Sequence, residues 1–106
     1  MEALAALGDP ALGDLLIEAL GHADAEVVKQ ALRSLAAKRE PRAAGRVSIG
    51  LDHASWDVRH TAATLLGTLG DPAAVQALRT RLVREEDGLV RAAIEDALAR
   101  TSERHG

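Results

Sequence analysis

The sequence repeats itself with a period of 31 residues, and this period limits the fold more than any other feature of the chain. An acidic residue followed by proline opens each unit, at Asp9-Pro10, Glu40-Pro41 and Asp71-Pro72. The sixth residue after each proline is apolar, namely Leu16, Val47 and Leu78. A unit this short cannot bury its apolar face alone, so neighbouring units have to stack on one another.

Each unit is expected to form two helices. The first begins after the acidic residue, which can cap it, and the proline takes the first helical position, where its missing N–H is not needed. The second begins at a capping residue (Asp24, Ser55 or Asp87), and apolar residues follow its first valine after four and eight positions. No segment alternates over the length of a strand. The pattern therefore predicts an all-α fold.

The stretch from Val58 to Val75, VRHTAATLLGTLGDPAAV, resembles a short HEAT-type repeat, and more closely the HEAT-like repeats first associated with phycobilisome lyases. The resemblance covers nearly the whole chain. It implies a right-handed α-solenoid of about three stacked antiparallel helix pairs. The first helices would lie on the convex side, and the second helices would line a concave groove. It also implies a non-catalytic scaffold that binds another protein or a peptide.

We expect a single HEAT-like repeat domain over residues 1–106. Its expected parts, in chain order, are the tail of a partial repeat at 1–7, repeat 1 at 8–38, repeat 2 at 39–69, repeat 3 at 70–100 and a flexible tail at 101–106. In the last repeat Glu95 takes the position of the apolar Leu32 and Ala63, which gives the array a polar outer face at its C-terminal end.

The N-terminal end lacks such a polar face, because Leu15 and Ile17 are apolar where later repeats carry mainly polar or small residues. One interpretation is that residues 1–7 cover these two side chains. Another is that they form an interface, either in a homodimer or with a different partner, since extra apolar surface often marks a contact. A third is that the chain was cut from a longer array.

The candidate binding residues lie on the second helices and point away from the core. They are Lys29, Arg33, His60, Thr64, Asp96 and Arg100. Arginine can hold a carboxylate through two hydrogen bonds, so the set favours an acidic or extended peptide as the partner. The alternative is an ordinary solvated helix face. Arg59 and Arg91 are expected to be structural instead, because the resemblance implies that Asp57 and Arg59 belong to a ladder of pairs between neighbouring repeats.

Catalytic and metal sites are not expected. The chain has no Cys, which excludes a thiol nucleophile and a Cys-ligated metal. His60 is followed by Thr61, so the His–Glu pairs of a di-iron repeat protein are missing. Trp56, which is the only Trp, Tyr or Phe, is expected to pack across the turn between helices, and Glu85 is expected in a solvated turn. We therefore expect no enzyme activity, no metal and no cofactor.

Two other functions rank below the protein-binding scaffold. The first is an accessory subunit of a bilin lyase or a similar maturation enzyme. The second is weak nucleic-acid binding, which the net charge of −3 disfavours even though Arg42, Arg46, Arg79 and Arg81 lie on first helices. No apolar run approaches the ~20 residues that a bilayer span requires, and no signal peptide opens the chain. We expect a cytoplasmic protein without a membrane partner.

Overall fold

The computed structural model describes residues 24–38 and 42–105, with side chains described as far as Thr101. This part of the chain is helical and contains no strand. Its elements in chain order are α3 (Ala25–Lys38), α4 (Ala43–Val47), the 3-10 helix η1 (Ser48–Asp52), α5 (Trp56–Leu69), the 3-10 helix η2 (Pro72–Ala74), α6 (Val75–Arg84) and α7 (Gly88–His105).

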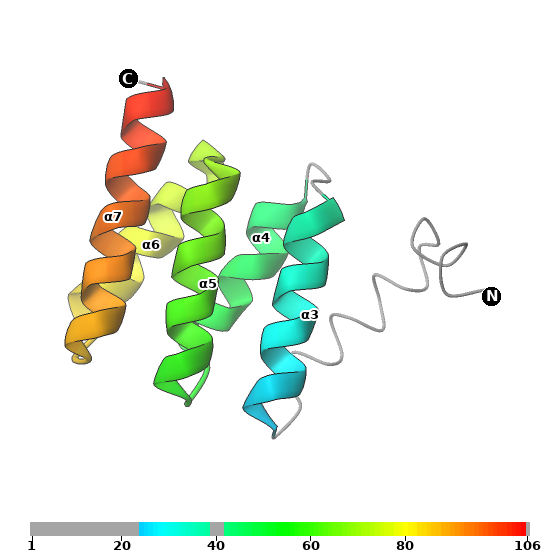
Figure 1. Cartoon of the computed structure of the whole chain (residues 1–106). Helices are drawn as coiled ribbons and strands as arrows, with labels where there is room; N and C mark the ends of the chain where they lie inside the picture. Colours follow the sequence, from blue (N-terminus) through cyan, green and yellow to red (C-terminus); the bar gives the residue numbers. More distant parts are fainter. Residues whose placement is uncertain (1–23, 39–41, 106) are drawn as a thin grey trace.

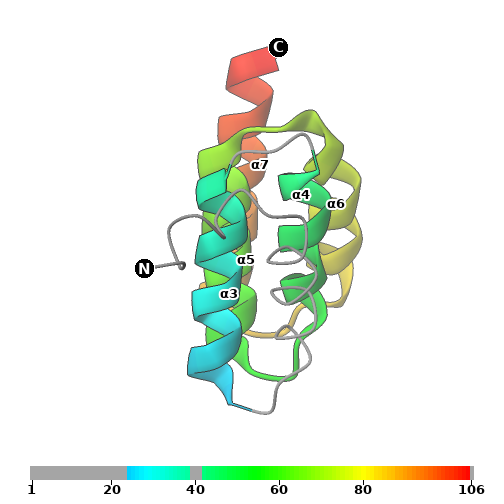
Figure 2. The ribbon, with the colours of Figure 1, turned by 90° about the vertical axis from the view of Figure 1, so that its right-hand side faces the viewer.

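The helices form two layers (Figures 1 and 2). In one layer α3, α5 and α7 lie side by side, with α5 in the middle and packed against both neighbours. The other layer holds α4 with η1, and α6. The first helix of a unit thus lies behind its second helix, and the units stack along the array. The chain forms an all-α solenoid, as the repeat predicts.

The hydrophobic core lies between the two layers. Its largest fully buried side chains come from both of them and include Leu32, Leu35, Leu51, Leu66, Leu78 and Ile94. The second helices bury the first valine of the predicted stripe at Val58 and Val90, which are both 0% exposed. Val27 at the equivalent position is 36% exposed, whereas its neighbour Val28 is 0% exposed.

The helix ends follow most of the capping signals in the sequence. The carboxylates of Asp24, Asp71 and Asp87 each accept a hydrogen bond of 2.9 Å from a backbone N–H two residues later. Gly70 ends α5 with φ 66°, a left-handed conformation that favours glycine. Ser55 holds the N-cap position of α5, but its hydroxyl makes no capping hydrogen bond.

Two segments differ from the regular pattern. The first helix of the second repeat changes from α4 to the tighter η1, where Gly50 packs so closely that an added Cβ would lie 2.8 Å from a methyl carbon of Leu32. At the other end, α7 continues to His105, and Thr101 is buried. Residues 101–105 are therefore in the last helix and not in the flexible tail expected from the sequence. No described helix combines the length and apolar composition that crossing a membrane requires.

Candidate functional site

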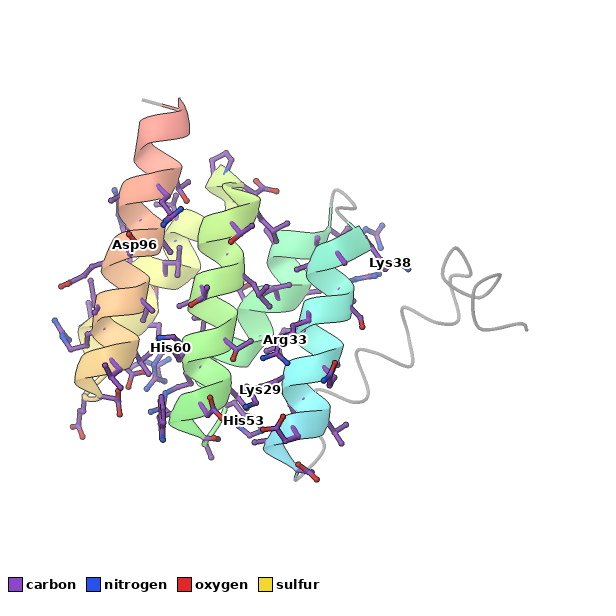
Figure 3. All side chains as sticks on the ribbon, viewed as in Figure 1. Lys29, Arg33, Lys38, His53, His60 and Asp96 are labelled. Atoms are coloured by element: carbon purple, nitrogen blue, oxygen red, sulfur yellow. The ribbon has the colours of Figure 1, made fainter. Side chains whose placement is uncertain are left out.

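Most of the predicted binding residues lie on the exposed side of the α3–α5–α7 layer, which we call the second-helix face. Arg33, Thr64 and Asp96 occupy equivalent positions on α3, α5 and α7, and all three are exposed. In Figure 3 the labelled side chains of Arg33 and Asp96 lie on the same side of the layer. The helical periodicity therefore placed this row correctly on the solvent side.

Lys29 differs from the rest of the set, because it is engaged within the fold. Its side chain is 10% exposed, and its Nζ lies 2.5 Å from Asp57 Oδ2 on α5 and 2.8 Å from Glu26 Oε2. The hydrogen bond that Lys29 donates to Asp57 raises its pKa above the ordinary value of 10.5, and the hydrogen bond to Glu26 adds a smaller effect in the same direction. This cation joins the first and second repeats, in contrast to the open groove position expected for it.

Asp96 and Arg100 pair with each other along α7. Arg100 Nε lies 2.7 Å from Asp96 Oδ2, and both side chains are more than half exposed. A pair of this kind contributes only about 0–1 kcal/mol to stability, so either partner can be given up to a ligand at small cost. The α7 end of the second-helix face is thus locally balanced in charge.

Trp56 is more exposed than expected. It is 46% exposed, and its ring meets His60 edge to face, with centroids 6.3 Å apart. The reason is helical geometry: Val58 points into the core, so the residue two positions earlier points about 200° away from it. Elsewhere, the backbone N–H of Ser55 donates to His53 Nδ1 at 3.0 Å. No group of three or more His, Asp or Glu placed to hold a metal occurs among the described residues.

A small groove of about 200 Å³ lies between α3 and α5 on the second-helix face. We call it the α3–α5 groove; it is lined by Arg33, Ala36, Ala37, Leu65, Thr68 and Leu69. None of these described lining residues carries a carboxylate, and the Arg33 guanidinium forms no salt bridge with any other described residue. Within the described part of the chain, the groove therefore combines an apolar floor with one cation that has no carboxylate partner.

The apolar part of this groove was missed at the sequence level. Leu65 and Leu69, four residues apart on α5, are only partly buried and pack against the edge of the core. The spacing of this leucine pair on one helix face was the available signal. Its meaning depended on how far α3 and α5 stand apart, which only the packed structure shows.

Glu85 is buried rather than solvated, and it connects the second and third repeats. Its Oε1 lies 2.8 Å from Arg59 Nε and 3.0 Å from Arg81 Nε, while its Oε2 accepts from the N–H of Asp87 at 3.0 Å. Burial alone would raise the pKa of Glu85. The hydrogen bonds from Arg59, Asp87 and Arg81 outweigh it and lower that pKa below 4.5.

Arg59 binds the turn that precedes α5, and Arg91 binds the end of α6 and the turn that follows it. Arg59 donates to the carbonyls of His53 and Ala54, each at 2.9 Å. Arg91 donates to the carbonyls of Leu82 and Glu85, also at 2.9 Å. The expectation that these arginines are structural is in line with these contacts.

The first-helix layer holds a second small groove, of about 170 Å³, beside Arg81 and Arg84. Both guanidinium groups pair with Asp52, at 3.3 and 3.0 Å. Asp52 thus neutralises part of the cationic charge on this side of the molecule. The predicted interface residues Leu15 and Ile17 lie outside the described residues.

Comparison with known protein families agrees with the repeat read from the sequence. A family model of HEAT repeats matches residues 13–99. A second model, of the PBS lyase HEAT-like repeat, matches residues 1–22. A search of curated proteins found no match.

Proposed function

The chain belongs to the HEAT-repeat family, and from this we propose that it is a non-catalytic scaffold that binds another protein through its second-helix face. HEAT repeats generally mediate protein–protein interactions. Because the stacked helices hold the face in place before binding, little conformational entropy is lost when a partner docks.

The α3–α5 groove supports the assignment of the second-helix face as the binding surface. Arg33 lies at an apolar groove where no described residue supplies a carboxylate to neutralise it, which is an arrangement suited to a ligand. On the first-helix side, Arg81 and Arg84 are already paired with Asp52. The difference favours the second-helix face over the opposite layer.

The two alternative functions have less support. A bilin lyase subunit would hold a chromophore or a client protein in its groove, and sites for small molecules and cofactors usually enclose about 300–1,000 Å³. The α3–α5 groove offers about 200 Å³. Nucleic-acid binding requires several free cations. Here Lys29, Arg59 and Arg81 are engaged with carboxylates of the fold.

Site-specific photo-crosslinking in cells tests the proposed face. A crosslinking amino acid would replace Thr64, which is exposed at the centre of the face, and in a second variant Arg79, which is exposed on α6 in the other layer. We expect a discrete crosslinked partner from position 64 and none, or much less, from position 79. Crosslinks from position 79 alone, or equal products from both positions, would overturn the assignment of the face.

A further inference from the structure

We infer that the α3–α5 groove binds an extended segment of the partner in which an acidic residue and a large aliphatic residue stand two positions apart. This inference rests on the proposed function and adds the chemical class of the bound segment. Its two elements are the Arg33 guanidinium and the apolar groove floor formed by Leu65 and Leu69.

The acidic residue follows from the charges around the groove. Arg33 is exposed, and none of the described residues that line the groove carries a negative charge. The carboxylates on this side of α3 and α5 are occupied elsewhere: Glu26 and Asp57 both pair with Lys29. A carboxylate from the partner would meet a planar guanidinium able to give it two hydrogen bonds.

The aliphatic residue follows from the size and lining of the groove. A space of about 200 Å³ is large enough for one side chain such as leucine or isoleucine, but not for a helix. Apart from Arg33 and the Thr68 hydroxyl, the lining side chains are alanine and leucine. Burial of one aliphatic side chain here removes apolar surface of both partners from water.

The spacing follows from the positions of the lining residues along the helices. Arg33 lies one helical turn before Ala37 on α3, and a turn rises about 5.4 Å. In an extended chain, residues two positions apart project to the same side and are separated by about 7 Å. When a carboxylate of the partner pairs with Arg33, the partner side chain two residues further along therefore lies beside Ala37, at the end of the groove.

A random-peptide phage display selection on the full chain, followed by fluorescence anisotropy of the enriched peptides, tests the inference. Three variants divide the site into its parts. Arg33→Glu reverses the charge, Ala37→Leu fills the groove without changing charge, and Arg79→Glu makes the same charge change on an exposed α6 residue of the other layer. Circular dichroism and thermal melts check that each variant is folded.

We expect the enriched peptides to share an acidic and an aliphatic residue two positions apart. Their affinity should fall about tenfold or more in Arg33→Glu and in Ala37→Leu, and stay unchanged in Arg79→Glu. Arg33→Lys should lose an intermediate amount, because lysine keeps the charge but not the planar fork.

Three results would overturn the inference: no enrichment of any peptide, enriched peptides without an acidic residue, or peptides that bind Arg33→Glu as tightly as the unchanged chain. If the peptides lack an acidic residue but bind Ala37→Leu less tightly, the second-helix face is still the binding surface, and only the inferred chemistry of the bound segment is wrong. Peptides that bind all variants equally would contradict the proposed face as well.

Discussion

Arg59 on α5 holds the carboxylate of Glu85 with two hydrogen bonds, of 2.8 and 3.1 Å, across the junction between the second and third repeats. The Glu85 side chain is 1% exposed, and Arg81 supplies a further hydrogen bond. Since a buried carboxylate is tolerated only where it is paired and hydrogen-bonded, this contact depends on the two repeats being stacked in one register.

Replacing Glu85 with glutamine should destabilise the domain by about 3 kcal/mol, because the partly buried Arg59 then loses its charged partner and Arg81 keeps only Asp52. Chemical denaturation followed by circular dichroism measures the change in the free energy of unfolding. Glu86→Gln is the matched control, because Glu86 is exposed next to it, and it should change stability by less than about 0.5 kcal/mol. Equal effects of the two substitutions would contradict the role given to Glu85.

The same carboxylate predicts how stability depends on pH. The pKa of Glu85 lies below its ordinary value of 4.5 in the folded chain. The contribution of the Glu85 carboxylate to the free energy of unfolding is therefore complete above pH 4.5. It is lost as the pH falls through the lowered pKa of the folded state. Melting curves from about pH 7 to about pH 3 should show the gap in stability between the unchanged chain and Glu85→Gln becoming smaller. A gap that stays constant down to the lowest pH would argue against this linkage.

Lys29 and Arg33 lie one turn apart on α3 and should behave in opposite ways. Lys29→Gln is expected to lower the melting temperature, because it removes the partner of Asp57, and to leave peptide binding nearly unchanged. Arg33→Gln is expected to weaken binding and leave the melting temperature unchanged. Thermal melts and anisotropy titrations of the two variants provide the comparison. If Lys29→Gln lost peptide binding with an unchanged melting temperature, Lys29 would belong to the binding site after all.

Two glycines of the second repeat should respond differently to alanine. An added Cβ at Gly45 meets nothing within 4 Å, so Gly45→Ala should stabilise the domain by about 0.5–1 kcal/mol through reduced backbone entropy of the unfolded chain. At Gly50 the added Cβ would lie 2.8 Å from Leu32 Cδ1, so Gly50→Ala should destabilise it. Denaturation midpoints that move in the same direction for both variants would not fit this packing.

Glu95 keeps the outer side of α7 polar. It is exposed, whereas Leu32 and Ala63 at the equivalent positions are fully buried beneath the next repeat. Glu95→Leu should therefore create a surface that attracts a second copy, seen as a mass that rises with concentration in light scattering after size exclusion. Glu95→Gln serves as the polar control, and an unchanged mass for the leucine variant would show that this side does not support stacking.

The local pattern of the chain was sufficient for the architecture. A 31-residue period, caps such as Asp71 and Asp87, and apolar residues at helical spacing depend only on neighbours in sequence, and they predicted two helices per unit and a stacked all-α array. Periodicity also placed Arg33, Thr64 and Asp96 on the exposed side, because side-chain direction in a helix follows from position alone.

Contacts between repeats could not be obtained in this way. Lys29 has the periodicity of an exposed residue, yet it is buried by Asp57, which lies 28 residues further along the chain. Glu85 is in a turn that looks solvated, yet Arg59, 26 residues before it, encloses its carboxylate. The α3–α5 groove likewise exists only because two helices pack at a certain separation. Sequence determined which side of each helix is apolar, and tertiary structure decided which charged residues remain available, because pairing depends on distances between side chains that are far apart in sequence.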